Sequence, residues 1–260
     1  MTARIALGIC YDGSAYHGWQ VQKELRTVQG EVERALSAVA DHIISVFCAG
    51  RTDVGVHANG QVVHFDTTSY RSGHSWVFGT NSHLPFDISI LWAKEVDKHF
   101  HARFSAQARR YRYMIYNHKI RPSLLCKAVS WYYQPLDENQ MRIAAQYFIG
   151  EHDFRSFQGA GCQSQTSVRT IFLIKIFRIQ CMVIIEVQGN AFLLHMVRNI
   201  VGVLIAIGSG KKKPEWAEII LKTKDYHKRG VTAPSNGLYL VEVTYSREFS
   251  LPKTPPGPFP

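Results

Sequence analysis

Apolar residues in the first hundred positions follow two different spacings. Over residues 28–40 they recur every three or four positions, which predicts an amphipathic helix. A second helix is predicted from residue 70 to residue 84, ending before Pro85. Short apolar or β-rich runs predict strands at residues 5–10, 43–47, 61–65 and 88–96. The resulting order, β-α-β-β-α-β, is that of a split βαβ, ferredoxin-like unit.

The second half of the chain repeats this order of elements. Asp137 is a predicted N-cap for a helix that runs to residue 148, and the mostly apolar residues 191–207 predict a long helix. Another helix is expected to open at residues 211–214 and to reach residue 224. Strands are predicted at residues 111–116, 171–179, 182–187 and 237–245.

These elements predict an α+β fold of two ferredoxin-like βαββαβ halves whose antiparallel sheets join, with a central active-site cleft between them. The expected boundaries are an N-terminal lobe that carries the candidate catalytic loop, a C-terminal lobe and a Pro-rich extended tail, at residues 1–105, 106–250 and 251–260.

The composition of the chain indicates which class of partner it could bind. Apolar residues make up 46% of the chain and charged residues 19%, as in ordinary globular proteins. Thirty Lys and Arg stand against twenty Asp and Glu, a net charge of +10. Such an excess favours a polyanionic partner, because neutralising phosphates releases counterions, although a solvated basic surface would produce the same numbers.

Several classes of protein are disfavoured by what the sequence lacks. The five cysteines are odd in number and widely spaced, which predicts reduced thiols in a cytoplasmic protein and no disulfide framework or structural zinc. No signal-peptide pattern opens the chain, and no apolar run is long enough to span a membrane. The twelve histidines form no metal-binding motif, so no metal site is expected.

The densest candidate chemistry lies in residues 49–58, AGRTDVGVHA, between two predicted strands. Arg51 and Asp53 are two positions apart, so in an extended backbone they project to the same side. The guanidinium would then favour the ionised carboxylate. Gly50 and Gly55 remove side chains on both flanks and would allow close approach of a ligand. The alternative is a surface Arg–Asp pair in a Gly-rich turn.

This segment resembles the signature G-R-T-D-x-G-V-H-A of the TruA family of tRNA pseudouridine synthases. The resemblance extends from about residue 5 to residue 251. It includes YDG and YHGWQVQ near the N-terminus, TVQGE, Asn81 with Leu84-Pro85, FHARFSA at residues 100–106, RYRY at residues 110–113, HMVRNIVG at residues 195–202 and GLYL at residues 237–240.

The resemblance implies a tRNA pseudouridine synthase with Asp53 as the nucleophile. Such an enzyme breaks the C1′–N1 glycosidic bond, rotates the uracil and rejoins it through C5. Attack on C6 of the base and assistance at C1′ of the ribose both remain open. Either role needs an ionised carboxylate beside a base taken out of its stack. Arg51 is implied to occupy the space that the base leaves.

The resemblance assigns further site residues in the second half. Tyr111 would stack on the target uracil and its hydroxyl could accept the C5 proton. Arg110 and Arg112 alternate with Tyr111 along the strand and so point to its other face, and they too are expected to bind the substrate. Arg198, in an apolar helix, would pair with Asp53, although snorkelling to solvent is the alternative. Leu238 would pack on the uracil, although it could equally be a core leucine.

The implied substrate is uridine at positions 38, 39 and 40 of the tRNA anticodon stem-loop. The resemblance also implies a homodimer with one tRNA straddling both subunits, and no cofactor. Two other functions compete. A non-catalytic tRNA-binding or tRNA-folding protein could use the same fold, and a glycosidic or phosphate-bond hydrolase would use a carboxylate. The hydrolase is disfavoured because glycosidases usually need a second carboxylate, and none follows Asp53 before Asp66.

Overall fold

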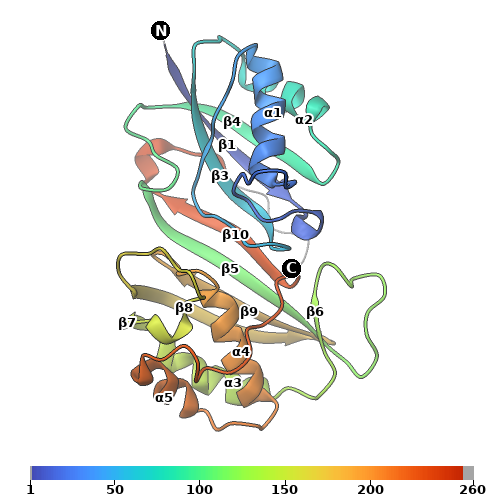
Figure 1. Cartoon of the computed structure of the whole chain (residues 1–260), viewed down its shortest axis with the longest axis vertical. Helices are drawn as coiled ribbons and strands as arrows, with labels where there is room; N and C mark the ends of the chain where they lie inside the picture. The colour runs from blue at the N-terminus through green and yellow to red at the C-terminus, as the bar shows by residue number, and fades with distance from the viewer. Residues whose placement is uncertain (1, 254–260) are drawn as a thin grey trace. The chain divides into compact units, whose positions relative to one another are not determined.

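The computed structural model describes residues 2–253 and divides the chain into two compact units. The first unit holds the residues up to Arg109 together with those from Tyr239 onward, and the second holds Arg110–Leu238. Each unit is mixed α+β, with a mostly antiparallel sheet and few helices (Figure 1). Residues 239–250, which the sequence analysis assigns to the C-terminal lobe, belong to the first unit. Most of the predicted tail, residues 254–260, lies outside the described residues.

The sheet of the first unit has the strand order β4-β1-β3-β10, and β2 also pairs with β3. Strand β1 is antiparallel to both β3 and β4, whereas β10 runs parallel to β3 with Tyr239 opposite His57. The strands are β1 (Ala3–Tyr11), β2 (Phe47–Cys48), β3 (His57–Thr67), β4 (Ile88–Val96) and β10 (Leu238–Tyr245).

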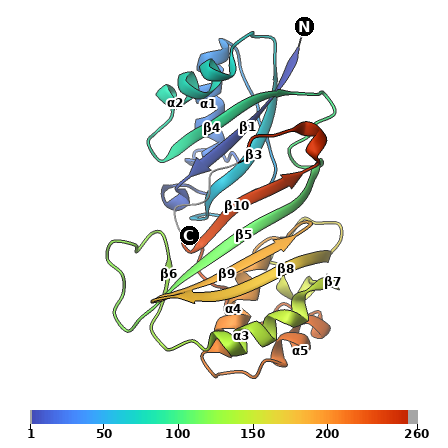
Figure 2. The ribbon, with the colours of Figure 1, turned by 180° about the vertical axis from the view of Figure 1, so that it is seen from behind.

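Helix α1 (Val28–Ala40) begins where the sequence predicts, because the Thr27 side chain caps the backbone N–H of Gly30. Its apolar stripe is fully buried. A π-helical turn, η2 (Ser75–Gly79), and α2 (Thr80–His83) follow β3. In Figure 1 these helices lie in front of the sheet, and Figure 2 shows the opposite face.

That opposite face of the first unit is also covered, which explains why β1 is apolar at nearly every position. Trp92 packs over Gly8, where an added Cβ would lie 2.1 Å from the indole nitrogen. The chain after β10 forms a short turn, η5 (Arg247–Phe249), and Lys94 binds it by donating to the carbonyl oxygens of Phe249 and Ser250 at 2.9 and 2.6 Å.

The prediction of a strand at residues 43–47 is wrong for residues 43–46. Only Phe47 and Cys48 pair with β3. The preceding residues follow α1 instead, because side chains of that helix satisfy their backbone: Ser37 accepts from the Ile44 N–H at 2.9 Å and Glu33 from the Val46 N–H at 2.9 Å. Ile44 and Val46 are buried in this connection, whereas Ile43 is 90% exposed, so the β-rich composition does not mark a strand here.

The sheet of the second unit has the order β5-β9-β8-β7, and β6 pairs parallel to β5. Its elements are β5 (Ala106–Asn117), β6 (Ser130–Tyr132), α3 (Glu138–Ala145), η3 (Gln146–Phe148), β7 (Gly150–Asp153), η4 (Arg155–Phe157), β8 (Val168–Ile179), β9 (Met182–Gly189), α4 (Met196–Gly208) and α5 (Trp216–Thr223). Asp137 caps α3 as predicted, by accepting from the N–H groups of Asn139 and Gln140.

Helix α4 begins at Met196, five residues later than the predicted start at residue 191. His195 adopts a left-handed backbone with φ of 59°, which cannot continue a right-handed helix toward the N-terminus. Upstream, the Asn190 side chain accepts from the N–H groups of Thr170 and Ala191 at 3.0 and 2.7 Å. Residues 191–195 are therefore a connection, in which Leu193 is buried and Leu194 is 37% exposed.

Candidate active site

The loop that carries Asp53 leaves β2 and returns as β3 in the first unit, and its first residues are held by backbone contacts. The Ala49 N–H donates to the carbonyl of Val62 at 2.8 Å. The Ala49 carbonyl accepts from the buried Arg109 guanidinium at 3.0 Å, and that of Gly50 accepts from the Gln61 amide at 2.6 Å. These bonds set where the loop departs from the sheet.

Thr52, the residue before Asp53, is anchored through both its side chain and its backbone. Its hydroxyl lies 2.7 Å from the Tyr11 hydroxyl, and its carbonyl accepts from the Trp19 N–H at 3.0 Å. Gly18 lies so close that an added Cβ would come within 2.8 Å of the same carbonyl oxygen, and its φ of 83° also favours glycine. The YHGWQ segment therefore fixes the backbone immediately before the candidate nucleophile.

Asp53 opens a tight turn that ends at Val56. The Val56 N–H donates to the Asp53 carbonyl at 3.1 Å, and Gly55 has φ of 75°, which is the signature of a type II turn. The Asp53 side chain is half-buried. An added Cβ on Gly13 would lie 2.0 Å from the Val56 carbonyl oxygen, so the segment after β1 packs directly on this turn.

His57 is a residue of the motif to which sequence reasoning assigned no role. Its side chain is buried, and its ring stacks on Tyr239 with 4.6 Å between centroids. Its Nδ1 lies 3.0 Å from the Asp12 carboxylate and 3.2 Å from the Gly13 nitrogen. The sequence signal that could have identified a role for His57 is its place as a polar residue at the start of a buried strand. His57 joins the end of the loop to the segment that supports it.

Arg51 differs from expectation. Its side chain is exposed, and within residues 2–253 it pairs with no carboxylate, so the expected Arg51–Asp53 ion pair is not formed. Positions two apart share a face only on a straight strand, whereas these residues lie in an anchored loop. Instead, Arg51 lies near Cys48: burial raises the pKa of that thiol to about 11, against the opposing effect of Arg51.

In the second unit, Tyr111 is almost fully buried and meets Phe192 edge to face at 5.1 Å between ring centroids. The neighbouring Tyr113 is a packing residue: it is fully buried, and its hydroxyl lies 2.6 Å from that of Ser130 and donates to the Pro234 carbonyl at 2.8 Å.

The two arginines beside Tyr111 are tied to β9. Arg112 forms an ion pair with Glu186 at 2.7 Å, and both side chains are largely buried, being 18% and 12% exposed. Arg110 donates to the side-chain carbonyl of Gln188 at 3.1 Å. The positive charge of Arg112 is therefore largely neutralised inside the unit, and a contact between Arg112 and RNA would compete with this pair.

Arg198 lies in the first turns of α4, against residues 231–234, here called the strap. Its Nε donates to the Ala233 carbonyl at 2.9 Å, and the Ala233 N–H donates to the Arg198 carbonyl at 3.1 Å. The Thr232 hydroxyl donates to the buried Asn199 side chain at 2.7 Å. At Gly202 an added Cβ would lie 2.0 Å from the Val231 carbonyl oxygen. The strap thus restricts the orientation of the Arg198 side chain.

Leu238 lies four residues after the strap and is buried, with only 5% of its surface exposed. Its N–H donates to the Ser235 carbonyl at 2.9 Å. The preceding Gly237 packs so closely on β5 that an added Cβ would lie 2.6 Å from the Met114 carbonyl oxygen. The position of Leu238 is therefore set by the hydrogen bond to Ser235 and by the packing of Gly237 on β5.

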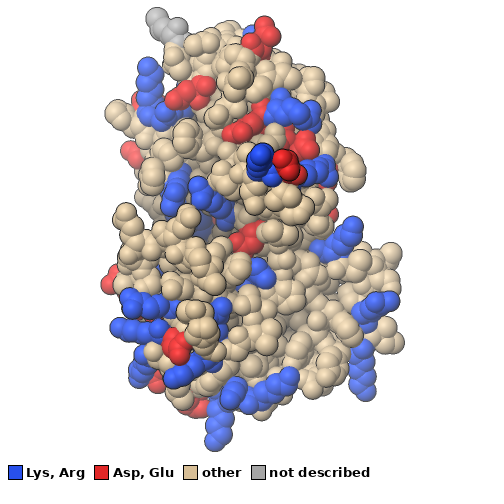
Figure 3. All heavy atoms as spheres, viewed as in Figure 1, with Lys and Arg blue, Asp and Glu red and all other residues tan. Residues whose placement is uncertain are grey.

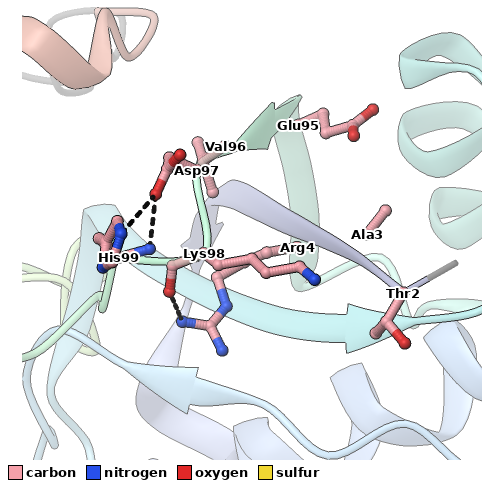
Figure 4. Close-up of a pocket in the computed structure, with 8 residues that line it drawn as sticks. All are labelled: Thr2, Ala3, Arg4, Glu95, Val96, Asp97, Lys98 and His99. Atoms are coloured by element: carbon pink, nitrogen blue, oxygen red, sulfur yellow. Dashed lines mark hydrogen bonds and ion pairs between the residues drawn. The ribbon is translucent and has the colours of Figure 1, made fainter.

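A hollow of about 540 Å³ lies elsewhere in the first unit, lined by residues 2–4 and 95–99 (Figure 4). Arg4 faces it, but its guanidinium already pairs with Asp66 at 2.7 Å and donates to the Lys98 carbonyl at 2.6 Å. None of the predicted site residues lines this hollow. We therefore assign it no part in the candidate chemistry.

Searches for two other features gave negative results over the described part of the chain. Residues 2–253 contain no group of three or more His, Cys, Asp or Glu side chains arranged to hold a metal ion. Over the same residues no helix has the length and apolarity needed to cross a membrane. The five cysteines, all within this range, are free thiols.

Comparison with known proteins gives matches along nearly the whole chain. A family model described as tRNA pseudouridine synthase matches residues 9–105 and 144–246. A protein named tRNA pseudouridine synthase A from Coxiella burnetii (strain Dugway 5J108-111) is 71% identical over 99% of this chain and 98% of its own length. One of the same name from Shewanella piezotolerans is 54% identical over 98% of each chain. A solved archaeal box H/ACA sRNP Nop10-Cbf5 complex aligns with a TM-score of 0.37 and 12% identity, over 77% of this chain and 43% of that one.

Proposed function

Because the chain belongs to the tRNA pseudouridine synthase family, we propose that it isomerises uridine to pseudouridine in transfer RNA. The observation that carries the proposal is the loop of residues 49–58. It presents one half-buried carboxylate, Asp53, on a backbone fixed from Thr52 to Val56. A nucleophile held in this way loses little orientational freedom when the substrate arrives.

We assign Asp53 the role of nucleophile. The reaction is an isomerisation: the C1′–N1 bond breaks, a C1′–C5 bond forms, and the proton on C5 leaves while N1 gains one. A single carboxylate can carry the covalent step through C6 of the base or by assisting at C1′. The target base must leave its stack to reach the carboxylate.

The roles of the other site residues follow the resemblance. Tyr111 is assigned to the target uracil, and its phenol to the C5 proton. Leu238 is assigned an apolar contact with the uracil ring. Arg51 is assigned to occupy the space that the base leaves, and Arg198 to pair with the Asp53 carboxylate. The surroundings of Arg198 and Leu238 support these roles, because the Arg198 side chain donates to the Ala233 carbonyl and the backbone before Leu238 packs closely on β5.

The finer expectations also belong to the proposal. We propose that the two units derive from the ferredoxin-like βαββαβ pattern, and that the substrates are the uridines at positions 38, 39 and 40 of the anticodon stem-loop. We further propose a cytoplasmic homodimer that needs no cofactor. The strand order β4-β1-β3 with β2 beside β3 supports the fold interpretation for the first unit.

The test is release of tritium from tRNA labelled at C5 of uridine. We expect the wild-type chain to release tritium and Asp53→Asn to lower the rate by at least about 10³-fold, while tRNA affinity stays within about twofold. Asp41→Asn is the matched control. Asp41 is exposed at the end of α1 with φ of 59°, a position that asparagine tolerates well.

Each result has a separate meaning. Substantial residual activity in Asp53→Asn would remove that residue from the mechanism. A wild-type chain that binds tRNA without releasing tritium would instead favour the non-catalytic tRNA-binding or tRNA-folding alternative.

A further inference from the structure

Two phenylalanine rings stand exposed near the candidate active-site loop. Phe47 in β2 is 56% exposed and Phe104, in the connection to β5, is 76% exposed. Phe47 stacks on His64 with 5.1 Å between centroids and an angle of 22°, and Phe104 lies 4.4 Å from the ring of His101. The two histidine rings are themselves 4.5 Å apart. We call these four side chains the aromatic platform.

The segment that carries Phe104 is rigid. The Ser105 N–H donates to the His101 carbonyl, and the His101 N–H donates back to the Ser105 hydroxyl, both at 2.9 Å. The Ala102 N–H donates to His64 Nδ1 at 3.1 Å, and the Ala102 carbonyl accepts from Tyr245 at 2.6 Å. The backbone that carries the Phe104 ring is therefore already ordered in the folded protein, so that RNA binding loses less conformational entropy there.

The surroundings of both platform histidines lower their pKa and so favour the neutral imidazole. Burial, together with the positive charges of its surroundings, lowers the pKa of His64 to about 4. Burial, with Arg4 and Arg103 nearby, also lowers the pKa of His101. In agreement, Nδ1 of His101 accepts from the Arg103 N–H at 3.1 Å. The rings thus support the phenylalanines as uncharged planes.

Positive charge is supplied beside the platform. The Arg103 guanidinium lies 5.5 Å from the Phe104 ring centroid. Its side chain is exposed, and within residues 2–253 it pairs with no carboxylate. Arg103 and Arg51 both oppose the rise in the pKa of the Cys48 thiol, which places both guanidiniums near β2. An aromatic surface flanked by unpaired arginines is the arrangement that single-stranded nucleic acid favours.

The platform is mounted on the same support as the candidate nucleophile. The buried Arg109 guanidinium donates to the Ala49 carbonyl at 3.0 Å and to the Arg103 carbonyl at 2.6 Å. It therefore joins the start of the Asp53 loop to the segment of Phe104. Phe47 precedes Asp53 by only six residues, a reach of at most roughly 20 Å in extended chain.

We propose that Phe47 and Phe104 form a stacking surface for a base of the substrate RNA near the target uridine, with Arg103 on the adjoining phosphate. This inference rests on the proposed function, because it names a second contact of the same substrate. Stacking tolerates any base, so the platform would hold the RNA near Asp53 once the target base has left its stack.

The experiment measures tRNA affinity in the full chain carrying Asp53→Asn, so that no turnover occurs. We expect Phe104→Ala and Phe104→Leu each to weaken binding at least about fivefold, because one base–aromatic stack is lost. Phe104→Trp should bind within about twofold of the parent. Phe78→Ala is the matched control: Phe78 is 62% exposed and stacks on His74 at 4.3 Å, but it lies in η2.

A second measurement separates binding from positioning. With Asp53 intact, Phe104→Ala should raise KM for tRNA while the rate at saturating tRNA stays within about twofold, and thermal unfolding should match the wild type because the ring is exposed. An unchanged affinity in both Phe47→Ala and Phe104→Ala would overturn the proposal. So would parental affinity in Phe104→Leu, since an apolar contact would then suffice, or a lower saturating rate with unchanged affinity.

Failure of the proposed function would appear differently. It would show as absence of tritium release by the wild-type chain, and it would leave the affinity comparison between Phe104 and Phe78 variants readable. Loss of affinity in Phe104→Ala equal to that in Phe78→Ala would also count against the platform.

Discussion

The two units differ sharply in charge. The first unit, residues 1–109 with 239–260, has 12 Lys and Arg against 12 Asp and Glu, whereas the second, residues 110–238, has 18 against 8. The whole excess of +10 therefore belongs to the second unit. On the face drawn in Figure 3, Lys and Arg spread over that unit with few acidic side chains among them. Most of the attraction to phosphate is thus assigned to the second unit, whereas the candidate nucleophile and the proposed phosphate contact of Arg103 belong to the first.

A second difference concerns how charge is held. In the first unit the Arg4–Asp66 pair leaves the carboxylate 48% exposed, whereas in the second the Arg112–Glu186 pair buries both partners. What the units share is the mounting of their candidate site residues, since each uses a glycine against a carbonyl oxygen, Gly13 in one and Gly202 in the other. The two units therefore position their candidate site residues in a similar way, by close backbone packing at a glycine, but they differ in net charge and in how far their ion pairs are buried.

Among variants that leave the candidate site residues unchanged, the largest effect is expected at the glycines that position them. Gly13→Ala would place a Cβ 2.0 Å from the Val56 carbonyl oxygen and displace the turn that Asp53 opens. We expect the tritium-release rate to fall about a hundredfold, because small displacements of reacting groups cost that much. Gly202→Ala, which displaces the strap, should act through Arg198 in the same direction.

The control for these variants is Gly73→Ala, where the added Cβ would lie 3.4 Å from the Ala93 carbonyl oxygen, an ordinary contact. A wild-type rate in Gly13→Ala, with the protein folded, would show that the placement of Asp53 does not depend on this packing.

A smaller effect is expected from the ion pairs. Glu186→Gln removes the carboxylate that pairs with the largely buried Arg112 guanidinium, so the free energy of unfolding should fall by about 2 kcal/mol. Asp66→Asn in the first unit should lower it by less than about 1 kcal/mol, because that carboxylate is half exposed and screened by water. Denaturant unfolding of both variants measures the contrast, and equal losses would contradict the difference drawn between the units.

The smallest effect is expected from single surface charges. Lys211→Gln with Lys213→Gln removes two exposed cations of the second unit, and tRNA affinity should fall several-fold. The slope of log affinity against log salt should also drop by about one for each lysine that contacts a phosphate. The matched pair in the first unit, Lys23→Gln with Arg71→Gln, should leave the slope unchanged. A drop of equal size in both pairs would mean that the RNA does not distinguish the units by charge.

Elements with strong periodicity were predictable. Helix α1 has the predicted bounds and β4 the predicted span, because one face of each meets a core and the sequence carries that spacing. Some errors concern helix starts, since α5 begins only at Trp216 and residues 70–72 are not helical. Two others fall on apolar runs without periodicity. Residues 43–46 follow α1 rather than a sheet, and residues 191–195 precede α4 rather than begin it. An apolar run does not by itself fix a backbone conformation, and these two runs contain exposed positions, such as Ile43 and Leu194, as well as buried ones.

The candidate site was predictable to the extent that it lies in one segment. Asp53 and its two glycines are contiguous, so their pattern is visible in the chain itself. The platform was not predicted, because Phe47 and Phe104 are 57 positions apart and each alone resembles a core residue. Only their measured exposure distinguishes them from ordinary packing.

By itself the sequence determined the family, the periodic elements, the carboxylate of the motif and the basic balance of the whole chain. Each of these depends on residue identity or on local spacing. The tertiary structure decided which unit carries the charge, why glycine is required at positions 13 and 202, and that Arg51 stands apart from Asp53. Those facts depend on distances between segments remote in the chain, and such distances are set only when the cores close around them.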